Sequence, residues 1–146
     1  MIAQTIQLAL APVFVLVAIG NILNLLSSRL GRVVDRSRHL QNVHTATEGP
    51  EHDVVVAEIR MIDQRIRLIT RAVSMLVSSG LAIGVTVALL FVQQLLAADL
   101  QLAAASTFVV AIVLLMYALL LFMRETRISA QQLKIPREYL ELDRKL

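Results

Sequence analysis

The sequence predicts an all-α membrane protein with three transmembrane helices, of which the first and second extend into a cytoplasmic helical hairpin. Hydrophobic residues make up 57% of the 146-residue chain, which is too apolar for a soluble domain of this size. Three stretches also carry no charged side chain, at 1–28, 72–98 and 100–123. Each is longer than the roughly 20 apolar residues needed to cross a bilayer, so each predicts one span.

The spans are expected near 7–26, 72–95 and 103–123, in a single membrane domain with the hairpin at about 29–71 and the tail at 124–146. Eight arginines lie in 29–71, and the other six basic side chains follow Met123. Only Asp99 is charged between the second and third spans. The positive-inside rule therefore predicts an outside N-terminus and a cytoplasmic hairpin and tail. The first span lacks the basic n-region of a cleaved signal peptide, so we expect it to be retained.

Apolar residues recur in steps of three and four along the predicted hairpin. The first series continues the first span, with Ile19, Leu23, Leu26, Leu30, Val33 and Leu40, and with Ser37 and His44 completing the register. The second leads into the second span, with Val55, Ile59, Ile62, Ile66, Ile69, Val73 and Leu76. Such heptads predict two packed helices that reverse at Gly49-Pro50 and project roughly 25 Å from the membrane. The alternative is a pair of amphipathic helices lying on the membrane surface.

The remaining connections are short. The segment 95–102 allows only a tight external turn, so the second and third spans should be antiparallel neighbours. After Met123 the tail should continue as a helix as far as Pro136. That proline can open a final helix on which Tyr139, Leu142 and Leu146 share one face.

Polar side chains near the inner end of the first span are candidate functional residues: Asn21, Asn24, Ser27 and Ser28. An amide that faces lipid leaves its donors and acceptors unpaired, so these residues should face protein or water. They either form interhelical hydrogen bonds or line a polar constriction. The same two interpretations apply to hydroxyls in the other spans, which can also bond to their own helix: Ser74, Ser78, Ser79, Thr86, Ser106 and Thr107.

Small residues at intervals of four, Gly80, Gly84 and Ala88, predict a close helix–helix contact within or between molecules. Arginines gather at the inner membrane edge, at Arg29, Arg32, Arg36, Arg67 and Arg71. They either snorkel to lipid headgroups or form an electropositive vestibule that concentrates anions. Asp63 and Arg67 have the (i, i+4) spacing of a helical ion pair.

Several classes of chemistry find no support in the sequence. The chain has no cysteine, which removes disulfides and thiolate catalysis. His39, His44 and His52 lie near Glu48, Glu51 and Asp53, but without a recognised metal-ligand spacing. We therefore expect no metal, no cofactor, no catalytic residue and no enzymatic activity. The net charge of +3 is explained by anionic headgroups, without nucleic acid.

Several segments carry a resemblance to a known group of proteins: 6–14, Asn24, 29–36, 65–69 and 121–125. Together they resemble an uncharacterised bacterial family of short three-span membrane proteins, a domain of unknown function. The resemblance covers nearly the whole chain and implies a topology in the cytoplasmic (inner) membrane, but no activity. The proton-channel subunits of the Ton and Tol systems are similar in topology alone, and this chain lacks a carboxylate within its spans.

The leading functional hypothesis is a homo-oligomeric assembly, ring-like in form, that acts as a channel for ions or small solutes. The alternative is a membrane scaffold or accessory subunit whose stalk binds a cytoplasmic protein partner. A lipid-handling role through the arginines at the inner membrane edge is the third hypothesis, and membrane lipid is the remaining expected partner.

Overall fold

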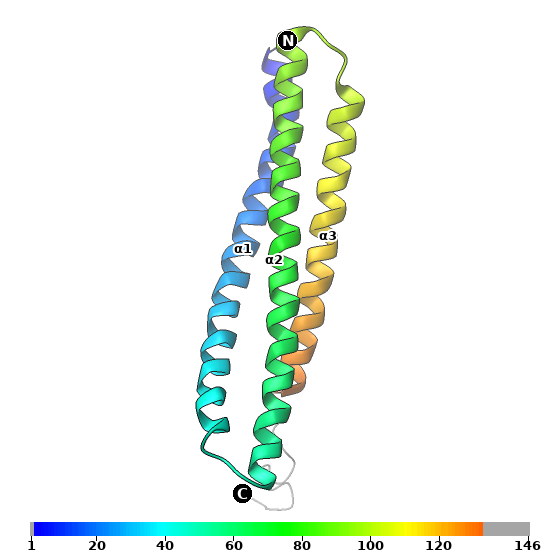
Figure 1. Cartoon of the computed structure of the whole chain (residues 1–146). Helices are drawn as coiled ribbons and strands as arrows, with labels where there is room; N and C mark the ends of the chain where they lie inside the picture. The colour runs from blue at the N-terminus through cyan, green and yellow to red at the C-terminus, as the bar shows by residue number, and fades with distance from the viewer. Residues whose placement is uncertain (1, 133–146) are drawn as a thin grey trace, which may run out of the picture.

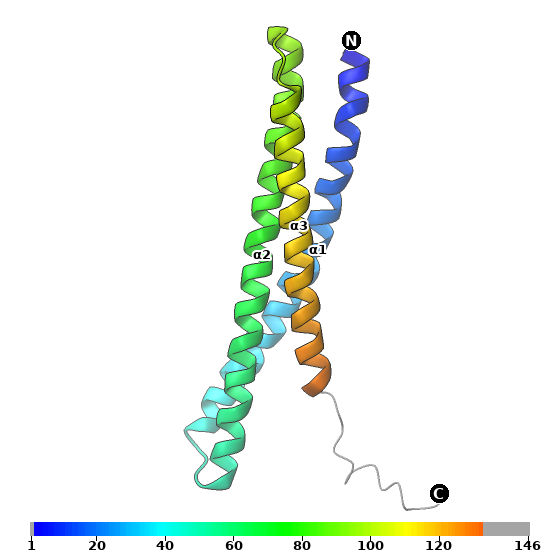
Figure 2. The ribbon, with the colours of Figure 1, turned by 90° about the vertical axis from the view of Figure 1, so that its right-hand side faces the viewer.

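The computed structural model describes residues 2–132 and contains three helices: α1 (Ile2–His44), α2 (Pro50–Leu96) and α3 (Gln101–Gln132). The helices run alternately up and down and lie side by side in an elongated bundle (Figure 1 and Figure 2). Helix α2 packs against both α1 and α3. The described residues contain no strand, so the predicted all-α fold is confirmed. The expected final helix with Tyr139, Leu142 and Leu146 lies outside the described residues.

The reversal between α1 and α2 occurs where the sequence predicts it. Gly49 has φ 71°, a backbone conformation that side chains with a Cβ atom disfavour. Pro50 then occupies the first position of α2, where its missing N–H has no helical acceptor to lose. Glycine and proline together therefore end one helix and begin the next, and the predicted helical hairpin is confirmed.

A second tight turn joins α2 to α3. Ala97 adopts the left-handed conformation with φ 48° and ψ 32°, and α3 begins at Gln101. The backbone N–H of Gln101 donates to Oδ1 of Asp99 at 3.3 Å, so this carboxylate caps the start of α3. As expected, the turn makes α2 and α3 antiparallel neighbours.

Most buried positions recur every seven residues along each helix. On α1 this series includes Ile19, Leu26, Val33 and Leu40. Helix α2 has two such series, Ile62, Ile69, Leu76 and Ile83, and Ala72, Ser79 and Thr86. On α3 the series is Ala104, Ala111, Ala118 and Glu125, and Leu121 is buried beside it. This repeat, 3.5 residues per turn, is typical of helices that pack as left-handed coiled coils.

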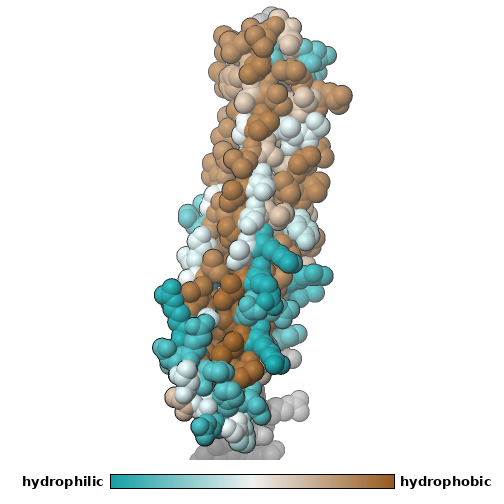
Figure 3. All heavy atoms as spheres, viewed as in Figure 1, coloured by the Kyte–Doolittle hydropathy of each residue, from teal (hydrophilic) through white to brown (hydrophobic). Residues whose placement is uncertain are grey.

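The outer surface is strongly apolar over the part of the bundle that contains the spans. All three helices are long and apolar enough to cross a membrane, which indicates a membrane protein. Only 17%, 22% and 17% of their most apolar windows are buried, so most of these side chains face lipid or another molecule. Figure 3 shows this apolar surface giving way to hydrophilic side chains towards the hairpin, which extends beyond the end of α3 (Figure 2).

Candidate functional site

The polar α1 face, defined as Asn21, Asn24, Ser27 and Ser28, points away from the rest of the molecule. All four residues are exposed, whereas Ile19 and Leu26 on the same helix are buried against α2. With 3.5 residues per turn, Asn21, Asn24 and Ser28 lie about opposite the buried positions. The structure therefore brings Asn21, Asn24 and Ser28 together on one surface, with Ser27 exposed at its side, and does not seal them inside the three-helix bundle.

Hydroxyl groups on α2 and α3, unlike the exposed polar α1 face, form hydrogen bonds within the bundle. Ser79 is fully buried, and its Oγ donates to the carbonyl oxygen of Ala111 at 2.7 Å. Thr86 and Thr107 share a hydrogen bond of 2.9 Å between their hydroxyl oxygens. Ser74 bonds back to its own helix, through the carbonyl oxygen of Thr70. The contacts of Ser79 and Thr86 hold α2 and α3 together, as the structural interpretation expects.

The small-residue stripe of Gly80, Gly84 and Ala88 lies beside α1 at Gly80 but is exposed at Gly84 and Ala88. A Cβ atom on Gly80 would lie 3.6 Å from Cδ1 of Leu16 on α1, whereas one on Gly84 would meet nothing within 4 Å. Gly84 and Ala88 are both exposed. Each step of four residues turns about 40° around an α-helix, so the stripe leaves the α1 contact and reaches the outer surface. Whether a second molecule packs there stays a prediction.

Five arginines are predicted to form an anion vestibule, and three of them form ion pairs with carboxylates. Nε and Nη2 of Arg36 donate to Oε1 of Glu58 at 2.9 and 2.8 Å, which ties the two sides of the hairpin together. Arg67 binds Asp63, the expected (i, i+4) pair. Arg29 binds Glu125, as described next. The remaining two, Arg32 and Arg71, are exposed and form no ion pair with another residue in 2–132.

A buried ion triad joins all three helices next to the ends of the charge-free stretches 1–28 and 100–123. The carboxylate of Glu125 on α3 is fully buried, with Arg29 of α1 on one oxygen and Arg65 of α2 on the other. Nη1 of Arg29 donates to Oε2 at 2.9 Å, and Nε of Arg65 donates to Oε1 at 3.0 Å. The Arg29 guanidinium also lies 4.9 Å from the ring centroid of Phe122, a cation–π distance. We call Arg29, Glu125 and Arg65 the ion triad.

The sequence patterns above do not predict this triad. They place Arg29 beside headgroups or anions, and Arg65 and Glu125 enter only through the family resemblance. A signal is nevertheless present, because Ala104, Ala111 and Ala118 follow a strict seven-residue repeat whose next position is Glu125. A carboxylate at a core position requires a buried cationic partner. The heptad repeat of the third helix therefore predicts a buried ion pair at Glu125, which the apolar series of the first two helices do not predict.

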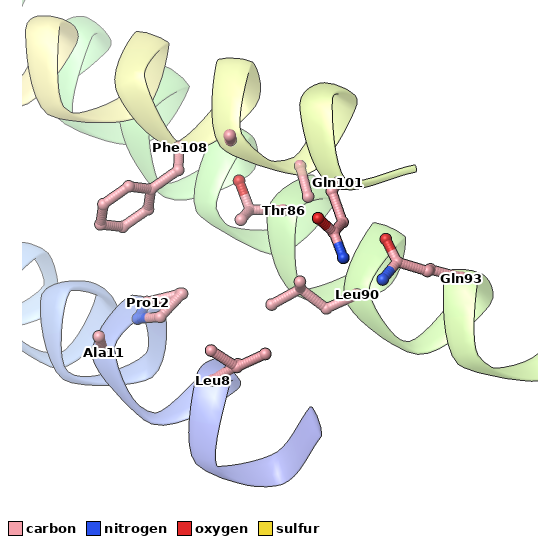
Figure 4. Close-up of a pocket in the computed structure, with 10 residues that line it drawn as sticks. Leu8, Ala11, Pro12, Thr86, Leu90, Gln93, Gln101 and Phe108 are labelled. Atoms are coloured by element: carbon pink, nitrogen blue, oxygen red, sulfur yellow. The ribbon is translucent and has the colours of Figure 1, made fainter. Parts of the chain in front are cut away.

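A groove opens between the three helices near the N-terminus of α1 and the turn that joins α2 to α3 (Figure 1). Its volume is about 410 Å³, and ten residues line it: Leu8, Ala11, Pro12, Thr86, Leu90, Gln93, Gln101, Ala104, Ala105 and Phe108. Figure 4 shows the amides of Gln93 and Gln101 at one end and the ring of Phe108 at the other. Oε1 of Gln93 is buried and accepts no hydrogen bond from the described residues. Most of the other lining residues are apolar.

The histidines near the hairpin turn are not arranged as metal ligands. The rings of His44 and His52 lie 4.4 Å apart at 54° to each other. Within the described residues, no group of three His, Cys, Asp or Glu side chains is close enough to hold a metal ion. The rings of His44 and His52 therefore contact each other across the turn that joins α1 to α2.

Comparison with known proteins places the chain in a family without assigning an activity. The model of DUF2721, described as a protein of unknown function, matches residues 9–135, so the chain belongs to this family. This confirms the resemblance to an uncharacterised family. No curated protein and no solved structure matches the chain significantly.

Proposed function

For this member of the DUF2721 family, we propose a homo-oligomeric membrane assembly that forms a channel for ions or small solutes. The observation that carries the proposal is the outward direction of the polar α1 face. Its asparagines belong to a stretch without charge that is long enough to span a membrane, yet no other helix of the same molecule covers them among residues 2–132.

Lipid is an unfavourable environment for this face. Moving an amide from water to a medium without hydrogen-bonding groups costs about 4–8 kcal/mol. Leaving the amides of Asn21 and Asn24 against hydrocarbon would therefore cost several kcal/mol, a large share of the roughly 5–15 kcal/mol free energy of unfolding of a typical domain. In an assembly of several copies, a water-filled path between their α1 helices would supply hydrogen-bond partners for these amides and hydroxyls. The same groups can replace water around a passing solute.

Two other features support the assembly. Gly84 and Ala88 are small, exposed residues on α2, where a neighbouring helix can approach closely. Arg32 and Arg71 are exposed at the inner membrane edge, where their charge favours anions at the channel mouth. The one-sided distribution of basic residues supports an orientation with the N-terminus outside and the hairpin in the bacterial cytoplasm.

The absence of cysteine allows a direct test, because a single introduced thiol is unique in the chain. Asn24→Cys places a thiol on the polar α1 face, and Val113→Cys places one at an exposed position on α3. In planar bilayers, a charged, membrane-impermeant thiol reagent should block the conductance of Asn24→Cys and leave that of Val113→Cys unchanged. Asn24→Leu should alter conductance without any reagent.

Other results would reject the channel. A monomer in native-like membrane discs would leave the polar α1 face uncovered and contradict the assembly. An unreactive Asn24→Cys thiol that instead forms disulfide-linked dimers would place the face in a dry contact between subunits. A structure of the oligomer with an axis filled by lipid or leucine would equally exclude a conducting path.

The second candidate function is a scaffold whose hairpin binds a cytoplasmic protein. The observation in its favour is that Val54 and Met61, seven residues apart on α2, are exposed on the hairpin. Contiguous apolar patches on an exposed surface are typical of protein contacts, and the seven-residue spacing puts Val54 and Met61 on one face of α2. A photo-crosslinking residue at Met61 should capture a partner in living cells, whereas one at the exposed polar position Gln64 should not. Equal labelling at both positions would remove this candidate.

A further inference from the structure

A small basic pocket lies beside the ion triad. It has a volume of about 210 Å³ and is lined by Arg29, Arg32, Val33, Arg65 and Ser129. We propose that this pocket binds a phosphate group, carried either by a phospholipid headgroup or by free phosphate. The proposal concerns a site on a single molecule, and it stands whether or not the chain forms a channel.

The pocket has a net positive charge, which favours the binding of an anion. Arg29, Arg32 and Arg65 bring three positive charges to it, and the ion triad supplies the single carboxylate of Glu125. These four groups together therefore carry two net positive charges. The Arg29 and Arg65 side chains retain only 28% and 17% of their exposure, so water screens them less than it screens surface arginines.

The geometry also suits a phosphate group. Glu125 holds Arg29 from α1 and Arg65 from α2 in fixed positions, so little side-chain entropy is lost when a ligand binds. Arg32 is one turn from Arg29 on α1, and Ser129 on α3 adds a hydroxyl donor. Guanidinium groups and hydroxyls are the usual donors to phosphate oxygens. At roughly 30 Å³ per water molecule, the volume admits a group of five heavy atoms.

The depth of the pocket favours a lipid as the source. Arg29 is the first charged residue after the stretch 1–28, and the chain leaves the stretch 100–123 two residues before Glu125. The pocket therefore opens where the apolar part of the bundle ends and headgroup phosphates begin. Basic pockets between transmembrane helices on the cytoplasmic side are a known arrangement for anionic headgroups.

The test compares two probes on the whole protein. The purified chain is titrated with phosphatidylglycerol or phosphatidylcholine and retained lipid is counted by native mass spectrometry, and inorganic phosphate is titrated by calorimetry. If the lipid is the ligand, phosphatidylglycerol should bind in preference to phosphatidylcholine, because the choline cation of the latter offsets its phosphate charge and is repelled by the arginines. Inorganic phosphate should then bind weakly. If free phosphate is the ligand, calorimetry should show saturable binding and the two lipids should be retained equally.

Variants identify the pocket as the binding site. Arg32→Gln removes one charge without touching the ion triad and should weaken binding of the preferred probe roughly tenfold, as expected for one charge-assisted contact. Ser129→Asp adds a carboxylate to the pocket and should weaken it further. The matched control is Arg71→Gln, the same change at an exposed arginine outside the pocket. Binding of neither probe to the native chain, or equal losses in Arg32→Gln and Arg71→Gln, would overturn the proposal.

Discussion

Removing the charge of Glu125 is the most direct perturbation of this structure. In Glu125→Gln the side chain keeps its size, but only one oxygen remains to accept a hydrogen bond. The new amide group then meets one of the two guanidinium groups of Arg29 and Arg65 with a donor instead of an acceptor. The variant therefore takes the carboxylate away from two partly buried positive charges, at the point where all three helices meet.

The magnitude follows from burial. Breaking a fully buried ion pair by removing one partner costs about 3–5 kcal/mol, because the remaining charge stays desolvated. Here Glu125 is fully buried but Arg29 is 28% exposed and Arg65 17% exposed, so water and headgroups can partly solvate the two cations. We expect a loss of about 2–3 kcal/mol in the free energy of unfolding, at or below the lower end of that range.

The same substitution elsewhere in the chain provides the control. Glu58 pairs with Arg36 across the hairpin, but the two side chains are 33% and 51% exposed. Exposed pairs contribute about 0.2–1 kcal/mol, so Glu58→Gln should cost less than about 1 kcal/mol. Reversible unfolding in mixed detergent micelles, followed by circular dichroism, measures both. Equal costs for the two variants would refute the idea that Glu125 is a buried charge held by two arginines.

Three further predictions follow from the same structure. Labelling of single-cysteine variants in intact cells should find Asp99→Cys accessible from outside and Gly49→Cys accessible only after lysis; external labelling at Gly49 would overturn the topology. Ile62→Asp should cost at least about 3 kcal/mol by burying a carboxylate in the hairpin core, whereas Gln64→Asp, at an exposed position, should be mild; equal tolerance would contradict the packed hairpin. Gly80→Leu should weaken the α1–α2 contact and lower the melting temperature, whereas Gly84→Leu should leave the melting temperature of the monomer unchanged and alter only the oligomer, as measured by native mass spectrometry. An unchanged melting temperature in Gly80→Leu would contradict a close approach of α1 to Gly80.

The helices and their connections could be predicted because the signals that define them are local. Charge-free stretches mark the spans, and Gly49-Pro50 marks the reversal through backbone chemistry alone. The heptad positions Ile19, Leu26 and Ile62 are buried as their spacing predicts. In each case, the information lies within a few turns of one helix.

The candidate sites were harder to predict because they depend on which face of a helix meets another. The spacing of Gly80 and Gly84 does not reveal that the stripe turns away from α1 after its first member. Likewise, the polarity of Asn21 and Asn24 requires a polar neighbour but does not say whether that neighbour belongs to the same molecule. Only the positions of α2 and α3 show that these helices do not supply it.

The position of the ion triad gives it a part in fixing how the helices align. Leucine and alanine cores tolerate sliding by a heptad, because similar side chains recur every seven residues. Glu125 differs from Ala104, Ala111 and Ala118, which precede it at that spacing, because it must meet two cations. A shift of α3 by seven residues towards the hairpin would separate Glu125 from both arginines, and a shift in the other direction would draw it into the apolar part of the bundle. A buried charge network can therefore specify the relative height of three helices even where an apolar core would be equally stable.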